Sequence, residues 1–353
     1  MQTPGPMIKH LILCGGGPSV FRTIGALHYL EDQHFWNINN IETIYATSAG
    51  AIFGAMICLK FDHETIEKYL IHRPWKEVFP IKMSQIMDIY SKKGLYDHNV
   101  AEIIFKPLLY AKDLTLTITL KELFEFSKIE LHMYALEINE FKTVDISYKT
   151  HPDLPLLHAL IMTSAIPTLF IPFCKDNGCY IDGGVTANYP LNFCLADGHK
   201  KEEILGLRFL YEKHVPTTNA SANANANANE VHVGALSESI KPDNDNNSNN
   251  NSNNNSSNNS NNNSSKNANN IINQQSNILD FLMGLFGKII SQIGTETKQE
   301  NIPYEIYCKT THMSFETLKS ALWFSSTRQE LLDSGAKFGE QFLSSLSPKK
   351  TIV

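Results

Sequence analysis

The segment Ile44-Tyr-Ala-Thr-Ser-Ala-Gly50 places a serine between a short apolar run and a strongly apolar helical pattern. Such a strand-to-helix turn is typical of a nucleophile elbow, which exposes a serine hydroxyl at a helix N-terminus. The residues that would form it around Ser48 are Ala46, Thr47, Ala49 and Gly50. Ala46 occupies the first position of the usual Gly-x-Ser-x-Gly pattern, which is tolerable where that position is crowded and not left-handed. Alternatively, Ser48 simply caps the following helix.

A second turn, Cys14-Gly-Gly-Gly-Pro-Ser19, also follows an apolar run and precedes a helical pattern. The backbone N–H groups of Gly15, Gly16 and Gly17 could form an anion cradle of the kind that an oxyanion hole requires. A dinucleotide-binding loop is another interpretation, although Val20 stands where the third glycine of Gly-x-Gly-x-x-Gly is expected. A purely structural tight turn is the third, and this turn alone does not separate them.

The third polar signal is Tyr180-Ile-Asp-Gly-Gly-Val185, in which Asp182 precedes Gly183 and Gly184. Asp-Gly-Gly is ordinarily a turn, but here it closely follows the segment Ser164-Ala-Ile-Pro167. The two glycines would let the backbone pass close to the serine turn. All three signals come directly after predicted strands, where the active sites of parallel α/β sheets gather.

Taken in order, the glycine turn, the Thr-Ser-Ala-Gly elbow, the Ser-Ala-Ile-Pro segment and the Asp-Gly-Gly tripeptide resemble the patatin-like phospholipases. The resemblance extends from about Ile8 to Pro190. It implies a three-layer α/β/α fold with a mostly parallel central sheet, and a lipid acyl-ester hydrolase of the phospholipase A type. It also implies that Ser48 is the nucleophile and Asp182 the base of a dyad, with an oxyanion hole from the glycine turn. The family's mechanism needs no histidine, metal or other cofactor.

Two places depart from the family's pattern. Ala46 replaces the elbow glycine, and Ser19 and Val20 stand where many members carry Arg or Lys followed by Gly. Backbone N–H groups do not depend on the missing side chain, whereas the lost positive charge bears on rate and head-group preference. Arg22 is a candidate to replace that charge, but we expect it to be a solvent-exposed helix residue.

Three alternative functions stay open. The first is a Ser–Asp–His triad such as Ser48, Asp182 and His199, although the polar loop around His199 favours a solvated histidine. The second is a lipid-binding or scaffold protein that retains the fold without catalysis, in view of the departures above. The third is a nucleotide-binding α/β protein that uses the glycine turn.

Strand and helix patterns alternate along the rest of the chain, which predicts the α/β class. We expect strands at Ile8–Cys14, Ile41–Ala46, Leu114–Leu120, Glu130–Ile138, Thr143–Tyr148, Cys179–Ile181, Ile204–Leu210 and Tyr304–Cys308. We expect helices at Thr23–Glu31, Ala49–Leu59, Asp62–His72, Leu154–Ser164, Ile278–Ile293 and Arg328–Phe342. The helix at Ile278–Ile293 is expected to be a core or lid helix, since its lone basic residue, Lys288, is poor support for a membrane-interface helix.

One long insert interrupts the pattern. Asparagine accounts for 17 of the 30 residues from 241 to 270, a composition that cannot bury enough apolar surface to offset the entropy of ordering. We therefore predict a catalytic core at residues 7–216, a disordered Asn-rich insert at 217–277, and the rest of the same domain at 278–345. The 353-residue chain remains long enough for one sizeable core without the insert.

Charge and cysteine content limit which binding partners and which cellular compartment we expect for this protein. The chain has 30 basic and 36 acidic residues, and it lacks a basic stripe, so we expect no nucleic-acid partner. No apolar run reaches the ~18–20 residues of a transmembrane helix, and the N-terminus does not resemble a signal peptide. The six cysteines form no metal-ligand spacing and are interpreted as reduced, buried thiols. We expect a cytoplasmic protein that contacts membrane surfaces transiently to reach a lipid or phospholipid substrate.

Overall fold

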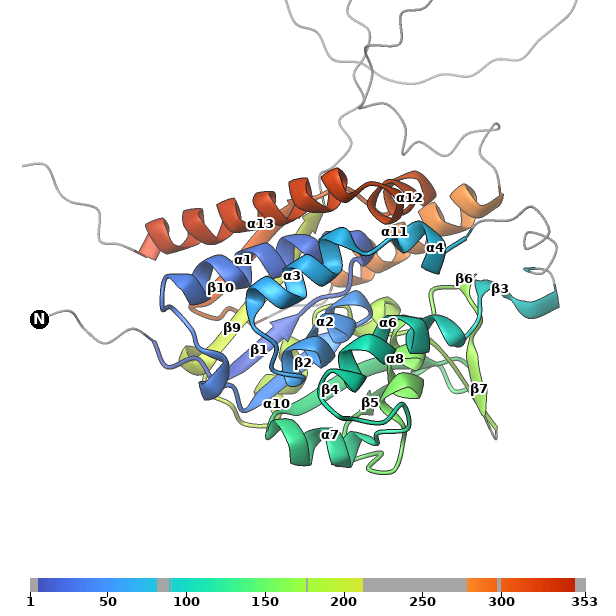
Figure 1. Cartoon of the computed structure of the whole chain (residues 1–353), viewed down its shortest axis with the longest axis horizontal. Coiled ribbons are helices and arrows are strands. Elements are labelled where there is room, and N and C mark those ends of the chain that lie inside the picture. The colour runs from blue at the N-terminus through green and yellow to red at the C-terminus, as the bar shows by residue number, and fades with distance from the viewer. Residues whose placement is uncertain are drawn as a thin grey trace, which may run out of the picture. The chain divides into compact units, whose positions relative to one another are not determined.

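The structure, a computed structural model, describes residues 6–80, 89, 91–175, 177–211, 278–296 and 300–346, which form a mixed β-sheet between helices (Figure 1). The strand order of the main sheet is β10-β9-β1-β2-β4-β8-β7, and β5 also pairs with β4. Its strands are β1 (His10–Leu13), β2 (Thr43–Thr47), β4 (Glu130–Glu137), β5 (Lys142–Ile146), β7 (Phe173–Lys175), β8 (Gly178–Asp182), β9 (Ile204–Tyr211) and β10 (Tyr304–Thr310). Strands β3 (Gly94–Tyr96) and β6 (Thr168–Phe170) pair separately.

The centre of the sheet is parallel. Strands β10, β9, β1, β2 and β4 all pair in parallel, whereas β5 and β8 run antiparallel to β4, and β7 antiparallel to β8. Strands β1, β2 and β4 are buried at every residue, as expected where helices cover both faces of a parallel sheet. The predicted α/β class with a mostly parallel sheet is confirmed.

The described helices are α1 (Val20–Asp32), α2 (Ala49–Cys58), α3 (His63–His72), α4 (Trp75–Val78), α6 (Asn99–Tyr110), α7 (Leu120–Ser127), α8 (Leu156–Ser164), α9 (Gly184–Ala187), α10 (Leu191–Ala196), α11 (Ile278–Glu296), α12 (Phe315–Trp323) and α13 (Ser325–Leu346). They form a layer on each side of the sheet. On one face, Leu131, Ile44 and Leu13 pack against Gly54 of α2. On the other face, the Thr47 hydroxyl donates to the carbonyl of Ala187 in α9 at 2.6 Å. The three-layer α/β/α arrangement is therefore confirmed.

The segment after the insert completes the layers described above. Strand β10 extends the sheet beside β9, and α13 runs along α1 (Figure 1). The two helices approach closely through glycines: a β-carbon on Gly25 would collide with the carbonyl of Leu332, and one on Gly335 with the carbonyl of Arg22. The described residues on both sides of the insert belong to one compact unit. The predicted insert, 217–277, lies outside the described residues.

One predicted strand, Leu114–Leu120, is wrong. Ile118 and Leu120 are buried, as the alternation suggests. With the described residues, however, the segment forms an isolated β-bridge from Thr119 to Pro155 and no strand. Instead, the hydroxyl of Thr119 accepts from the Glu122 amide, and the Glu122 side chain accepts from the Thr119 amide, a capping box that starts α7 at Leu120. Local capping thus prevailed over a period-two pattern.

The prediction that the cysteines are reduced, buried thiols needs a correction. Cys174 and Cys179 form a disulfide between β7 and β8. The two residues are register partners on neighbouring antiparallel strands, with Cα atoms 4.0 Å apart, a proximity that their separation along the chain did not indicate. Cys14, Cys58, Cys194 and Cys308 are buried and free, as expected.

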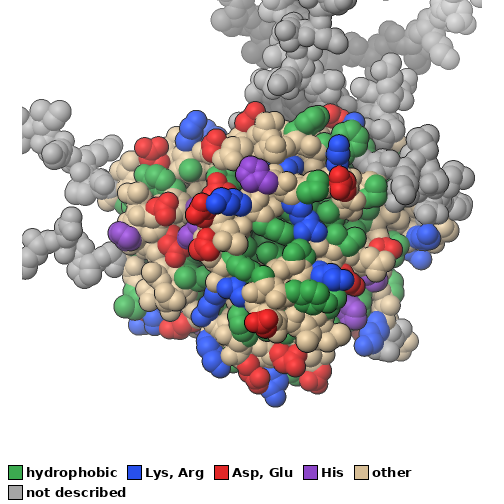
Figure 2. All heavy atoms as spheres, viewed as in Figure 1, with side chains coloured by type: hydrophobic (Ala, Val, Ile, Leu, Met, Phe, Trp, Pro, Cys, Tyr) green, Lys and Arg blue, Asp and Glu red, His purple; other side chains and the backbone are tan. Residues whose placement is uncertain are grey.

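The surface carries both signs of charge. In the face shown in Figure 2, basic and acidic side chains are interspersed, with hydrophobic side chains between them. Within the described part of the chain, no helix combines the length and the apolar character needed to cross a bilayer.

Candidate active site

The sharp change of direction between β2 and α2 builds the elbow. Strand β2 ends at Thr47 and α2 begins at Ala49, so Ser48 alone makes the turn. Its backbone has φ 56° and ψ −130°, a combination that residues other than glycine rarely adopt. Such strain persists only where the surrounding structure holds it, and it is concentrated at functional sites.

Close backbone packing explains the small residues of the elbow. A β-carbon on Gly50 would lie 2.6 Å from the carbonyl oxygen of Leu13 and 2.7 Å from that of Cys14, so glycine lets α2 begin against the end of β1. Ala46 is a fully buried residue of β2 and has no left-handed φ. Its methyl group packs in the core, and the alanine is therefore compatible with the elbow.

The Ser48 side chain meets a single carboxylate. Its Oγ donates a hydrogen bond to Asp182 Oδ2 at 2.5 Å, and both residues are buried. Burial raises the pKa of Asp182 to about 6, against the lowering effect of hydrogen bonds from Ser48 and from the Gly184 amide. A carboxylate with this pKa can accept a proton near neutral pH more readily than an exposed aspartate.

The end of β8 and the two glycines after it position Asp182. The Gly184 amide donates to Asp182 Oδ1 at 2.7 Å, which leaves Oδ2 directed at Ser48. A β-carbon on Gly183 would collide with the carbonyl of Tyr134 on β4, so the chain passes against β4 as the glycines suggested. The expected meeting of the elbow and the Asp-Gly-Gly turn is present.

The glycine turn lies directly against the elbow. A β-carbon on Gly15 would be 3.0 Å from the β-carbon of Ser48. The Gly15 amide donates to the carbonyl of Asn188 at 3.1 Å, so this residue anchors the turn. For the amides of Gly16 and Gly17, no described residue provides an acceptor. These two N–H groups of the turn are therefore the ones that an anion could use.

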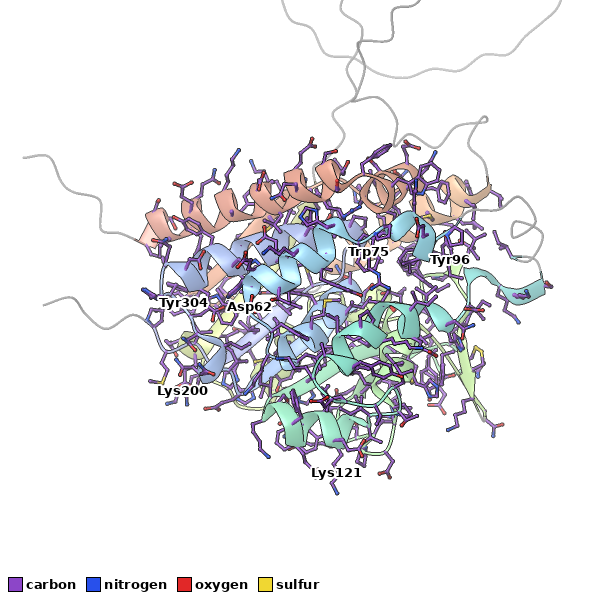
Figure 3. All side chains as sticks on the ribbon, viewed as in Figure 1. Asp62, Trp75, Tyr96, Lys121, Lys200 and Tyr304 are labelled. Carbon is purple, nitrogen blue, oxygen red and sulfur yellow. A yellow bond between two sulfur atoms is a disulfide. The ribbon has the colours of Figure 1, made fainter. Side chains whose placement is uncertain are left out.

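An apolar pocket opens beside Ser48 and the glycine turn. Its volume is about 170 Å³. Apart from Gly17, Ser48 and Ser164, its lining is almost entirely aliphatic or aromatic. The wall includes Ile52, Phe53 and Met56 of α2, Trp75 of α4, Phe79 directly after α4, Tyr96 of β3, Phe170 of β6, Met313, and Leu318 and Leu322 of α12. Trp75 and Tyr96, both labelled in Figure 3, each have a ring contact with Phe79. The pocket is therefore suited to a hydrocarbon chain.

The histidine proposed for a triad lies elsewhere. His199 Nε2 is 3.1 Å from the Tyr45 hydroxyl, and its ring stacks on His10 with 3.8 Å between centroids. The two carboxylate oxygens of Asp182 are taken by Ser48 and Gly184. The Ser48–Asp182–His199 alternative is thus not supported. Among the described residues, no cluster of three or more His, Cys, Asp or Glu side chains could hold a metal ion.

Ser19, one of the positions that depart from the family's pattern, belongs to a small polar contact with Thr310 and Arg22. Ser19 is buried, and its hydroxyl lies 2.7 Å from that of Thr310 on β10. Arg22 Nη1 donates to the same Thr310 hydroxyl at 3.3 Å. The expectation of a solvent-exposed Arg22 is wrong, because α13 and β10 partly cover this end of α1.

Two residues of the site were missed at the level of sequence. The Thr163 hydroxyl accepts from the Ser48 amide at 3.0 Å and donates to the Tyr134 carbonyl at 2.5 Å. The carbonyl of Asn188 holds the Gly15 amide. The sequence marked both residues only by their position near a motif. Thr163 directly precedes the Ser-Ala-Ile-Pro segment, and Asn188 follows Asp-Gly-Gly. Neither signal specifies a hydrogen bond.

Comparison with known proteins agrees with this geometry. Residues 11–195, just over half of the chain, match the sequence model of the family described as Patatin-like phospholipase. The chain belongs to the patatin-like phospholipase family. The match contains the glycine turn, the elbow, the Ser-Ala-Ile-Pro segment and Asp182, the same features that carried the resemblance.

Individual relatives are more distant. A protein of Invertebrate iridescent virus 6 named "Probable lipid hydrolase 463L" is 30% identical over 202 residues, which are 55% of this chain and 66% of the relative. Uncharacterized protein R571 of Acanthamoeba polyphaga mimivirus is 26% identical over 186 residues, 52% of this chain and 60% of the relative. The matches to both thus span less than two thirds of the relatives' own lengths.

A solved structure shares the fold. VipD from Legionella pneumophila superposes with a TM-score of 0.50 at 16% sequence identity, covering 96% of this chain and 67% of VipD. At this identity the likeness concerns the fold alone, and it agrees with the three-layer arrangement described above.

Proposed function

We propose that this patatin-like protein is a lipid acyl-ester hydrolase of the phospholipase A type that acts through an acyl-Ser48 intermediate. The observation that carries the proposal is the 2.5 Å hydrogen bond from Ser48 Oγ to Asp182 Oδ2 beside an apolar pocket. Nucleophile and base are within the range that proton transfer requires. The family and the printed name of the iridescent virus relative support a lipid ester as the substrate.

The proposed reaction has two halves. In the first, Ser48 Oγ attacks the ester carbonyl while its proton passes to Asp182, and the alcohol then leaves with that proton. In the second, a water molecule gives a proton to Asp182 and attacks the acyl-serine. The bond between the acyl carbon and Ser48 Oγ then breaks, Asp182 returns the proton to Ser48 Oγ, and a fatty acid is released. The negative charge that develops on the carbonyl oxygen would be stabilised by the amides of Gly16 and Gly17.

The pocket supports a lipid substrate by its chemistry. A fatty acyl chain seated among α2, α4 and α12 would remove apolar surface from water without leaving a polar group unpaired. A charged or strongly polar acyl group would lose its hydration there and gain almost no hydrogen bonds. We therefore expect esters of long acyl chains to be preferred over acetate esters.

Labelling with a serine-reactive fluorophosphonate tests the proposal. We expect the folded protein to be labelled, Ser48→Ala to lose the label, and Ser127→Ala to keep it. Ser127 is a matched control because it is also a buried serine, and its hydrogen-bond partners, Ile129 and Cys58, lie outside the candidate active site. Absence of labelling in the folded protein would favour the alternative, a lipid-binding or scaffold protein that retains the fold.

We further propose that the exposed face of α11 contacts the lipid surface. One face of this helix, with Leu279, Met283 and Phe286, is buried. Another face exposes a row of four apolar side chains at helical spacing: Ile278, Phe281, Leu285 and Ile289. The helix lies close to the site, since Ile290 approaches Gly184 and Gly287 faces the carbonyl of Met313. An exposed apolar row is the part of an interfacial helix that enters a lipid surface. Since Lys288 is the lone basic residue of residues 278–293, the contact would rest on these apolar side chains and not on charge.

Sedimentation with phosphatidylcholine vesicles tests this contact. The double variant Phe281→Ser/Leu285→Ser should bind vesicles more weakly than the wild type, without a loss of folded protein. The matched control is Ile138→Ser/Phe141→Ser, which removes two exposed apolar side chains at the β4–β5 turn. Equal losses in the two double variants would show that apolar exposure in general, and not α11, governs binding.

A further inference from the structure

The last turn of α8 carries a threonine whose hydroxyl connects two separate backbone segments. Thr163 is fully buried. Its Oγ1 accepts a hydrogen bond from the Ser48 amide at 3.0 Å and donates one to the Tyr134 carbonyl at 2.5 Å. The elbow amide is thereby connected through one side chain to the carboxyl-terminal half of β4.

The same turn of α8 also holds the backbone of the carboxylate. The Asp182 amide donates to the Ala165 carbonyl at 3.1 Å, and the Gly183 amide donates to the Thr163 carbonyl at 3.3 Å. Residues 163–165 therefore contact both members of the Ser48–Asp182 pair. This contact gives a structural role to Ala165, the second residue of the Ser-Ala-Ile-Pro segment, which the proposed reaction itself does not use.

Among the described residues, the Thr163 side chain provides the hydrogen bond that connects α8 to the Ser48 amide. The positive φ of Ser48 separates its amide from the hydrogen bonds of β2 and α2, so the amide needs an acceptor from elsewhere. A hydroxyl can accept this hydrogen bond and donate another to the Tyr134 carbonyl at the same time. Valine has the same shape and can do neither.

We propose that Thr163 is a positioning residue that sets the distance between Ser48 and Asp182. It touches no reacting atom and acts by holding the strained elbow against the backbone that presents the carboxylate. The inference rests on the proposed function, because it assumes that Ser48 and Asp182 act together. Loss of the connection would lengthen the short Ser48–Asp182 hydrogen bond while leaving the apolar pocket in place.

Steady-state hydrolysis of a long-chain p-nitrophenyl ester tests the inference with Thr163→Val and Thr163→Ser. We expect Thr163→Val to lower kcat by about 10- to 100-fold with little change in KM, since small misplacements of reacting groups have effects of this order. Thr163→Ser keeps the hydroxyl and should retain kcat within about threefold. The acid limb of the kcat–pH profile should move to higher pH in Thr163→Val, because the Ser48 hydrogen bond lowers the pKa of Asp182.

Thr43→Val is the matched control. Thr43 is also a buried threonine, at the opposite end of β2 from the elbow, and its hydroxyl is 2.7 Å from His10 Nδ1. It should lower the melting temperature, as Thr163→Val does, but leave kcat and the pH profile unchanged. If Thr163→Val is folded and keeps the wild-type kcat, or if Thr43→Val loses as much kcat, the inference is wrong.

Two further variants keep the test decisive. If Thr163→Val does not fold, Thr163→Cys replaces the hydroxyl with a weaker donor and acceptor of similar size. An intermediate kcat in Thr163→Cys supports the inference, and the wild-type kcat contradicts it. Ser48→Ala is measured in parallel: if it still hydrolyses the ester, the proposed function fails, whatever the Thr163 variants do.

Discussion

The two ends of the central sheet each bury ionisable groups, but the two clusters differ in how their charges are paired. At the carboxyl end, Asp182 faces Ser48 and one backbone amide. At the amino end, His132 pairs with Glu130 and Asp145 at 2.9 Å each, and Lys149 reaches Glu130 at 2.7 Å. We call this second group the amino-end cluster.

The buried carboxylates of the two clusters, Asp182 and Glu130, have pKa values shifted in opposite directions. Burial raises the pKa of Asp182 to about 6. Burial also acts to raise the pKa of Glu130, but pairing with His132 and Lys149 brings it below its ordinary value. Burial opposes protonation of His132, yet Asp145 and Glu130 raise its pKa to about 9. The amino-end cluster thus satisfies its charges, whereas the carboxyl end keeps a carboxylate poised to take a proton.

Charge compensation separates polar clusters that stabilise the fold from those that are candidates for chemistry. The amino-end cluster contains histidine and two carboxylates, the residue types from which active sites are commonly inferred, but its charges are compensated. The Ser48 site has fewer ionisable groups, but it has backbone strain at the serine, an uncompensated carboxylate and an apolar pocket. Four predictions test this contrast.

The largest effect is expected from the dyad itself. Ser48→Ala and Asp182→Asn should each lower turnover by on the order of 10³-fold or more, and the double variant should be hardly worse than either, because residues that act as a unit are not additive. A double-mutant cycle of kcat/KM for a lipid ester measures this. Wild-type turnover in folded Asp182→Asn would remove Asp182 from the mechanism.

His132→Ala should affect stability and leave chemistry unchanged. Removing the imidazole leaves Glu130 buried with one fewer cation, and breaking a buried ion pair in this way costs about 3–5 kcal/mol. Chemical denaturation should show this loss, while kcat of the folded variant stays at the wild-type value. A large fall in kcat without a loss of stability would mean that the amino-end cluster takes part in function.

Asp182→Asn should stabilise the protein at alkaline pH. The folded-state pKa of about 6 exceeds the ordinary value of 3.8, so the folded state binds the proton more tightly than the unfolded chain. This group therefore stabilises the wild type fully below about pH 3.8, and the contribution is lost as pH rises through about 6. At pH 8 the variant should be more stable by on the order of 3 kcal/mol. The advantage should shrink by pH 5; a constant difference across this range would contradict the raised pKa.

The smallest effect is expected from His199→Ala. Its ring contacts Tyr45 and His10, away from Asp182, so kcat should stay within about threefold of the wild type, as for a residue outside the catalytic unit. Hydrolysis should also survive EDTA. A large loss in His199→Ala, with a histidine pKa disappearing from the rate profile, would move the protein to the triad class.

Local patterns predicted the elements of this site well, because each is encoded by neighbours along the chain. The helix after Ser48 and the strand before it were predicted to within a few residues, as was the helix at Leu154–Ser164. The strand predicted at Leu114–Leu120 failed because the capping of Thr119 competes with alternation at the same residues. The fold class followed from the order of strands and helices.

Sequence reasoning alone therefore reached the fold class, the residue types of the site and its approximate place at the carboxyl ends of the strands. These depend on short-range chemistry: periodicity, turn residues and the need for glycine where backbones approach. Three features depended on folding in three dimensions: the Cys174–Cys179 pair, the Thr163 bridge and the separation of His199 from Asp182. Each joins or separates residues on different elements, and their distances are set by how the sheet and helices pack, which no local pattern specifies.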